Sequence, residues 1–158
     1  MPRECLFCHK MAKLDELPPD EVVWKFPFSV AILGPWQSYH GYCILVSRIH
    51  ATELNQLGDE ERLTFLDEMC LLAKAIEDCF HPKKLNYEML GNQTPHMHWH
   101  VIPRYQNDTD FAHPIWLAID RVKEDKAARQ KLKTGPTDNL KTASLLRLRL
   151  QAIAPGTP

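Results

Sequence analysis

The sequence predicts an α+β domain built on a mainly antiparallel sheet. Runs rich in β-branched and aromatic residues come in two groups, and one long helical pattern separates the groups. The chain has 158 residues, of which 44% are hydrophobic and 25% charged, and this is typical of one globular domain with a hydrophobic core.

The first group of predicted strands lies within residues 22–47. The segment VVWKFPFSVAILG (22–34) predicts two strands, or one strand with a bend near Pro27, and GYCILVS (41–47) predicts a buried strand. We expect residues 1–20 to be irregular, because the sequence LPPD at 17–20 interrupts regular structure.

A helix of about five turns is predicted over residues 59–80. Acidic residues at 59–61 suit the positive end of a helix dipole, and Pro82 follows the last turn. Apolar residues at spacings of three and four predict the face that packs on the sheet: Leu63, Leu66, Cys70, Ala73, Ile76 and Phe80.

The second group of strands follows this helix. The segments LNYEML (85–90) and HMHWHVI (96–102) predict two strands, joined by GNQTP. The last forty residues predict two helical pieces that divide near KTGPTDN (133–139) and end in a frayed APGTP. We assign residues 117–158 to a helical extension that packs on the domain of residues 1–116.

Composition excludes several classes of protein. The net charge of -1 argues against duplex nucleic acid as a partner, although a pocket can still be locally positive. No segment reaches the ~18 apolar residues that span a membrane, and MPRECLFCHK lacks the features of a signal peptide, so we expect a cytoplasmic protein. Five cysteines disfavour a disulfide framework, and Cys43, Cys70 and Cys79 are expected to be buried.

The most specific pattern lies in GNQTPHMHWHVIPR (91–104), where His96, His98 and His100 alternate with apolar residues. Alternate side chains of a strand share one face at a spacing of ~6.6 Å, so the three imidazoles are expected on one face and Met97, Trp99 and Val101 on the other. Two chemistries fit this row. The histidines can ligate an open catalytic zinc, or one neutral imidazole can act as a nucleophile at phosphorus.

HMHWHVI resembles the signature of the histidine triad (HIT) superfamily, His-φ-His-φ-His-φ-φ, in which φ is apolar. The wider segment LGNQTPHMHWHVIPRY and the downstream DFAHPIW are similar to small bacterial HIT proteins described as diadenosine tetraphosphate hydrolase-like. The resemblance runs from about Cys5 to Trp116. It implies the HIT fold, with about five antiparallel strands, and a two-fold homodimer that doubles the sheet.

The resemblance also implies the chemistry. His98 corresponds to the nucleophile that attacks the α-phosphorus of a nucleotide and forms a nucleotidyl-histidine, and His100 to the residue beside that phosphate. A hydrolase of dinucleoside polyphosphates or nucleoside phosphoramidates is therefore expected. Nucleotidyl transfer to an acceptor other than water, and a non-catalytic nucleotide-binding protein of the same fold, are the alternatives.

The segment CLFC places the thiols of Cys5 and Cys8 at a spacing typical of zinc sites. The sequence has no second such pair, so histidines must complete a tetrahedral set. The resemblance implies that these are His50 and His96. Four protein ligands would close the site, so Zn²⁺ is expected to be structural; the alternative is a mobile N-terminus with two unpaired thiols.

The loop before the histidines is the expected substrate contact. Gly91 allows the backbone to approach a ligand, and Asn92, Gln93 and Thr94 offer donors to phosphate oxygens.

Two positions depart from the family pattern. Tyr42 stands where many members carry a histidine and is expected to donate a hydrogen bond to the substrate, with His40 as a candidate substitute for that histidine. Gly34 stands where other branches place an Asn or Asp that binds ribose. Arg104 is expected at the surface, and the alternative is that it neutralises a distal phosphate of the substrate.

Overall fold

The structure, a computed structural model, describes residues 5–158. Its strands form one antiparallel sheet in the order β1-β2-β3-β5-β4. The predicted α+β class and five-stranded sheet are confirmed. The strands are β1 (Val22–Lys25), β2 (Ser29–Leu33), β3 (Cys43–Ser47), β4 (Lys84–Glu88) and β5 (His98–Arg104).

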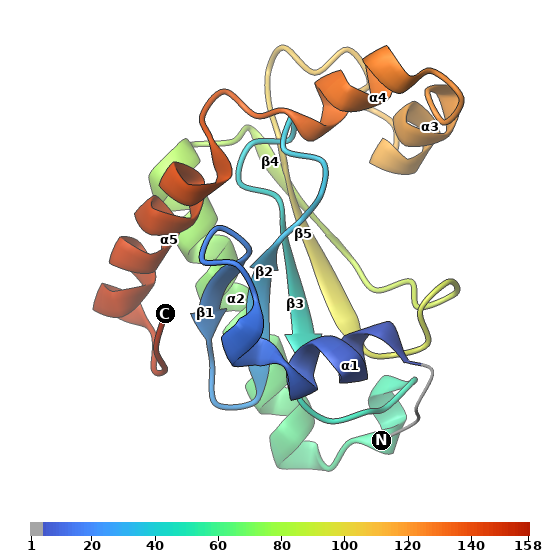
Figure 1. Ribbon diagram of the computed structural model, residues 1–158. Helices are drawn as coiled ribbons and strands as arrows, with labels where there is room; N and C mark the ends of the chain where they lie inside the picture. Colours follow the sequence, from blue (N-terminus) through green and yellow to red (C-terminus); the bar gives the residue numbers. More distant parts are fainter. Residues whose placement is uncertain (1–4) are drawn as a thin grey trace.

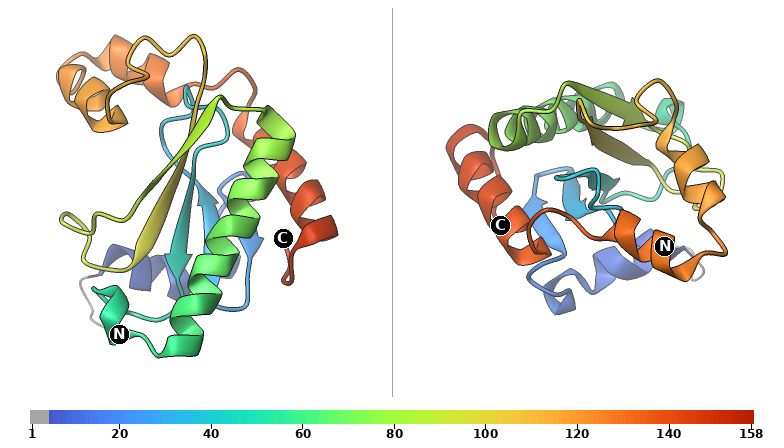
Figure 2. Two further views of the ribbon diagram at one scale, coloured as in Figure 1. Left: turned by 180° about the vertical axis from the view of Figure 1, so that it is seen from behind. Right: turned by 90° about the horizontal axis from the view of Figure 1, so that it is seen from above.

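The helix α2 (Asp59–Phe80) runs along one face of the sheet, with α5 (Asn139–Ile153) beside it (Figures 1 and 2). The short helix α1 (Leu6–Ala12) lies on the opposite face, at the end of the sheet where β5 begins (Figure 1). Side chains alternate between the two faces, so each face has its own apolar core. Met97, Trp99 and Val101 belong to the core under α2, as their alternation with the histidines predicts.

The buried face of α2 agrees only in part with the predicted one: Ala73 and Ile76 are buried as predicted and Phe80 is partly buried. Leu63 and Leu66 are exposed, and so is Cys70, which was expected to be buried; Cys79 is partly buried and Cys43 fully buried. The buried residues are Phe65, Glu68, Met69, Leu72, Ala73, Ala75 and Ile76. The sequence contains two overlapping apolar stripes, and spacing alone cannot choose between them. The buried stripe includes Glu68, whose carboxylate accepts hydrogen bonds from Phe28 N at 2.8 Å and from Ser29 Oγ at 2.5 Å.

Both ends of the described chain are more ordered than predicted. The N-terminal segment, expected to be irregular, contains α1 and a 3-10 turn (Leu14–Glu16). Away from the ends, a second 3-10 turn spans Leu54–Gln56, between β3 and α2. The C-terminal part forms three helices, since α3 (Ile115–Arg121) and α4 (Lys126–Lys133) precede α5. The predicted fraying is wrong, because Thr157 and Lys25 exchange two backbone hydrogen bonds of 2.6 and 3.1 Å along the edge of β1.

Within residues 5–158, none of the helices has the length and apolar character that crossing a membrane requires.

Candidate functional site

Strand β5, which lies between β3 and β4, carries two of the three histidines. His98 lies opposite Val46 of β3, and His100 lies between Ile44 of β3 and Glu88 of β4. Both imidazoles project from the face opposite α2, and both side chains are buried. His96 precedes the strand, and its backbone N–H donates to Thr94 O at 2.8 Å.

One nitrogen of His98 is engaged and the other is free to react. Nδ1 lies 2.6 Å from the carbonyl oxygen of His96, so Nδ1 carries the proton and Nε2 the lone pair. The Phe7 ring of α1 packs on this imidazole, with ring centroids 4.8 Å apart. Burial lowers the pKa of His98 from its ordinary value, which keeps the imidazole neutral at pH 7.

His100 is held from two sides. Its Nδ1 lies 2.7 Å from the hydroxyl oxygen of Tyr42, and the Trp116 ring meets it edge to face at 5.0 Å. The Trp116 indole in turn donates to the carboxylate of Glu88. Burial lowers the pKa of His100 to about 4, so this imidazole is also neutral at pH 7.

A cavity of about 480 Å³ opens in front of these imidazoles. The predicted substrate residues Gly91, Asn92, Gln93 and Thr94 line it together with His98 and His100. The other lining residues are Phe7, Pro35, Ile44, Leu90 and Trp116. Gly91 has a φ of 71°, a left-handed conformation that favours glycine, and the turn brings the loop over the cavity. Tyr42 is not among the lining residues: it is 1% exposed and lies behind His100.

The four residues predicted as zinc ligands converge beside this cavity. In the part of the chain that the structure describes, Cys5, Cys8, His50 and His96 are the group of side chains close enough to hold a metal, with their ligand atoms within 4.8 Å of one another. His96 Nδ1 lies 3.4 Å from Cys5 Sγ, 3.6 Å from Cys8 Sγ and 3.3 Å from His50 Nδ1. Cys8 Sγ lies 3.2 Å from His50 Nδ1.

These distances fit a tetrahedral zinc. With bonds of about 2.3 Å to sulfur and 2.0 Å to nitrogen, the edges of the tetrahedron are about 3.3–3.8 Å long. The tautomer of His96 also fits, because its Nε2 donates to Ser47 O at 2.8 Å and leaves the Nδ1 lone pair toward the sulfurs. Burial and the Cys5 thiol raise the pKa of the Cys8 thiol, so a bound cation is needed to hold Cys8 as a thiolate.

Two of the secondary expectations are wrong. His40 cannot replace a histidine at position 42, because its ring packs on Phe80 at 4.3 Å and its Nε2 lies 3.1 Å from Thr137 Oγ1, on the α2 and α5 side of the sheet.

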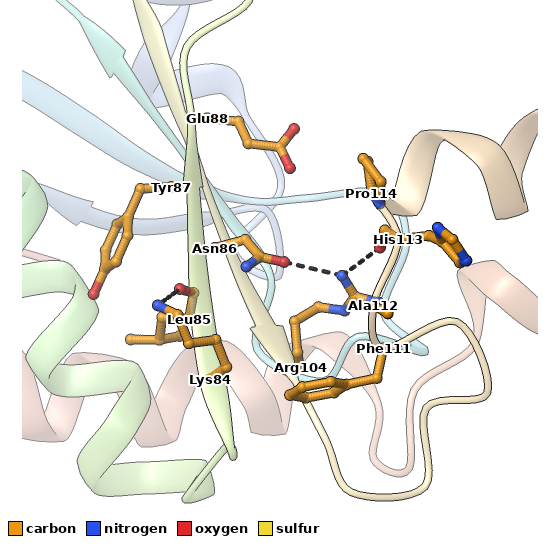
Figure 3. Close-up of a pocket in the computed structure, with 10 residues that line it drawn as sticks. All are labelled: Lys84, Leu85, Asn86, Tyr87, Glu88, Arg104, Phe111, Ala112, His113 and Pro114. Carbon is orange, nitrogen blue, oxygen red and sulfur yellow. Dashed lines mark hydrogen bonds between the residues drawn. The ribbon is translucent and has the colours of Figure 1, made fainter.

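Arg104 is not at the surface, since its side chain is 2% exposed. Its guanidinium donates to Asn86 Oδ1 at 2.9 Å and to the His113 carbonyl at 2.8 Å (Figure 3), and it forms an ion pair with Asp108. Arg104, Asn86 and His113 line a second hollow of about 340 Å³ between β4 and residues 111–114 (Figure 3). Arg104 is therefore a structural bridge and lies outside the lining of the histidine cavity.

Of the five lining residues that the sequence interpretation missed, two pack on the histidines, namely Phe7 on His98 and Trp116 on His100. Phe7 stands between the two cysteines, and its place in CLFC gave a signal, because a residue between two ligands is carried to the metal site. Trp116 lies in DFAHPIW, but nothing in local spacing indicates that this segment returns to His100.

Comparisons with a family model, with curated proteins and with solved structures all relate this chain to HIT proteins. A family model described as the HIT domain matches residues 16–107. Protein hit of Bacillus subtilis (strain 168) is 28% identical over 128 residues, which are 77% of this chain and 86% of that protein. Adenosine 5'-monophosphoramidase HNT1 of Saccharomyces cerevisiae is 26% identical over 101 residues, which are 63% of this chain and 62% of that protein.

The solved structure of a Zn-bound histidine triad family protein from Mycobacterium smegmatis superposes with a TM-score of 0.66. The two proteins are 17% identical, and the match covers 95% of each chain. At this identity the likeness concerns the fold.

Proposed function

Because the chain belongs to the HIT domain family, we propose that it is a hydrolase that cleaves a nucleotide at its α-phosphate, with His98 as the nucleophile. The substrate class is a dinucleoside polyphosphate or a nucleoside phosphoramidate. The observation that carries the proposal is the 2.6 Å contact between His98 Nδ1 and the His96 carbonyl, which leaves Nε2 as a free lone pair.

The proposed reaction has two steps at one phosphorus. His98 Nε2 attacks the α-phosphorus; a P–N bond forms, and the P–O or P–N bond to the leaving group breaks with its electron pair. Where the leaving atom is nitrogen, it takes up a proton from solvent as it leaves. Water then attacks the same phosphorus, the bond to Nε2 breaks, and a nucleoside monophosphate and a proton are released. A neutral imidazole needs no base for the first step and is a good leaving group in the second.

The remaining cavity residues would bind the phosphate. His100 lies beside His98, with ring centroids 4.8 Å apart, and as a neutral donor it would hydrogen-bond a phosphate oxygen. Asn92 and Gln93 are exposed at the rim and would add amide donors, and Thr94 a hydroxyl. The yeast relative's name, adenosine 5'-monophosphoramidase, supports a phosphoramidate as one of the substrates to test.

We further propose a structural zinc held by Cys5, Cys8, His50 and His96. Such an ion would supply charge to the two thiolates and fix α1 against the start of β5. The rival interpretation, an open catalytic zinc on the three histidines, is disfavoured by the hydrogen bonds of His96 and His98. His96 directs Nδ1 at the cysteines, and His98 has Nδ1 on a carbonyl, so the three rings do not aim lone pairs at one point.

A cytoplasmic homodimer is part of the same proposal. A reducing compartment would keep Cys5 and Cys8 available to a metal. The outer edge of β4 ends the sheet, and Tyr87 on that strand is 44% exposed and points toward α2 (Figure 3). Leu63 and Leu66, on the same helix, are also exposed. A second copy would cover this edge and the exposed leucines, and sedimentation velocity measures whether it does.

The experiment that tests the function follows diadenosine tetraphosphate and adenosine phosphoramidate by chromatography with the wild type and with His98→Asn. We expect the wild type to release AMP and the variant to lose at least about 10⁴-fold in kcat, because the covalent step disappears. His113→Asn is the matched control, since His113 is an exposed histidine outside the cavity.

Three other outcomes distinguish the alternatives. Full activity of His98→Asn would contradict the nucleophile assignment. Binding of AMP without turnover of either compound would favour the non-catalytic nucleotide-binding protein. Labelling of the wild type at His98 without release of AMP to water would favour transfer to another acceptor.

A further inference from the structure

Among the described residues, the Tyr42 hydroxyl has one hydrogen-bond partner, which is His100. The phenol is 1% exposed, and its hydroxyl oxygen lies 2.7 Å from His100 Nδ1. Burial raises the pKa of Tyr42 well above its ordinary value, so the hydroxyl keeps its proton. Because this buried hydroxyl has no other partner in the part of the chain that the structure describes, its O–H is satisfied only by donating to His100 Nδ1.

This donation selects one form of His100. Nδ1 can accept only when it carries no proton, so the proton of the neutral ring stands on Nε2. The imidazole lines the cavity and touches the rings of His98 and Trp116. The other titratable group near it is Glu88, across the strand pair, whose carboxylate accepts from Trp116. In this tautomer His100 offers an N–H donor, whereas the opposite tautomer would turn a lone pair toward a phosphate oxygen and repel it.

The space for the tyrosine ring comes from Gly34. A Cβ on Gly34 would lie 2.4 Å from Cδ1 and Cε1 of Tyr42 and 2.7 Å from Cγ, far inside van der Waals contact. The backbone there does not itself require glycine, because its φ lies outside the left-handed region. Gly34 N also donates to Tyr42 O at 2.8 Å, which fixes the two residues against each other. Glycine is therefore required at position 34 because a side chain there would clash with the Tyr42 ring, and not because of the backbone conformation.

We propose that Tyr42 and Gly34 act as one unit: Tyr42 is a positioning residue that holds His100 with its Nε2–H toward the substrate, and Gly34 provides the space for its ring. The two departures from the family pattern are then a single change. The proposal rests on the proposed function for its catalytic consequence, whereas the tautomer can be measured without any substrate.

The test is Tyr42→Phe, which removes the hydroxyl and keeps the ring. We expect kcat to fall roughly tenfold or more, as for loss of a partner that orients a functional histidine, with KM changed less than about threefold. ¹⁵N NMR of His100 should change from a single Nε2–H tautomer to a mixture. Tyr105→Phe is the matched control, because the Tyr105 hydroxyl also donates a partly buried hydrogen bond of 2.7 Å, to His40 O, away from the triad. It should leave kcat and the His100 tautomer unchanged.

A second variant tests the role of Gly34. In Gly34→Ala the new methyl displaces the Tyr42 ring, so His100 should lose the same tautomer; in the double variant with Tyr42→Phe, kcat should fall no further than in Tyr42→Phe alone. An unchanged His100 tautomer in Tyr42→Phe overturns the proposal whatever the turnover. If the His100 tautomer changes in Tyr42→Phe while the wild type cleaves no nucleotide, the positioning role is upheld and the hydrolase is rejected.

Discussion

The Cys–His cluster and the histidine cavity lie next to each other, but their imidazoles differ in which nitrogens are engaged. In the cluster, His96 uses Nε2 for the Ser47 carbonyl and turns Nδ1 to the cysteine sulfurs, so no nitrogen is left for a substrate. In the cavity, His98 and His100 use Nδ1 for a carbonyl and a phenol and keep Nε2. The nitrogen that a histidine uses for its hydrogen bond therefore determines whether the imidazole can hold a metal or react with a substrate, and its place in the motif matters less.

The largest effect on stability is expected from the cluster. Cys8→Ser removes a buried ligand, so we expect loss of bound zinc and a drop in the free energy of unfolding on the order of 5 kcal/mol. Metal analysis and denaturant unfolding measure the two quantities. Cys70→Ser, at an exposed thiol, should change neither.

The separate roles of the Cys–His cluster and the histidine cavity would be contradicted if removing the metal affected turnover and not stability. A chelated protein that remains stable but loses all turnover at once, and regains it with zinc, would mean that the metal belongs to the cavity.

A smaller effect is expected from the pH dependence of the cavity. The pKa of His100 is about 4 in the native state and about 6.5 in an unfolded chain, so between these values the unfolded state binds a proton that the native state does not. Stability from this group is complete above pH 6.5 and is lost as the pH falls toward 4, by about 3 kcal/mol.

Denaturant unfolding of the wild type and of His100→Gln at several pH values isolates this contribution. The difference in unfolding free energy between the two proteins should shrink as the pH falls, because all other titrating groups are shared. A difference that is constant with pH would mean that the pKa of His100 is the same in the native and the unfolded state, as for an imidazole in contact with solvent.

Local patterns predicted those features that depend on one strand or one turn of chain. The alternation in HMHWHVI placed the histidines and Trp99 on opposite faces because a strand has a period of two. The buried side of α2 was not predictable from spacing, since the correct stripe contains Glu68 and its partners come from β2 and the residue before it.

The motifs and the family resemblance predicted which residues come together in the Cys–His cluster and in the loop of residues 91–94. The roles of these residues remain predictions. The environment of Tyr42 did not follow, because its hydroxyl partner, His100, is 58 residues away in the chain. Arg104 was misplaced for a related reason. Its burial depends on Asp108 and on carbonyl groups of the following loop, which no period in the sequence indicates.

The smallest predicted effect concerns Phe7, the residue that belongs to both regions. It lies between Cys5 and Cys8 on α1, yet its ring packs on His98 and lines the cavity. If the cluster serves only to hold α1 and the cavity only to bind and cleave substrate, Phe7→Ala should leave the zinc content unchanged. It should raise KM roughly tenfold, because the lost aromatic contact is worth about 1–2 kcal/mol of substrate binding.

Leu6→Ala is the matched control, because Leu6 is on the same helix but 56% exposed, and its KM should stay at the wild-type value. Metal analysis and steady-state kinetics on the two variants decide the point. Loss of zinc in Phe7→Ala would mean that the ring holds the ligands together, and the two regions would then be one unit. A lower kcat with KM unchanged would mean that the ring orients His98 and does not contact the substrate.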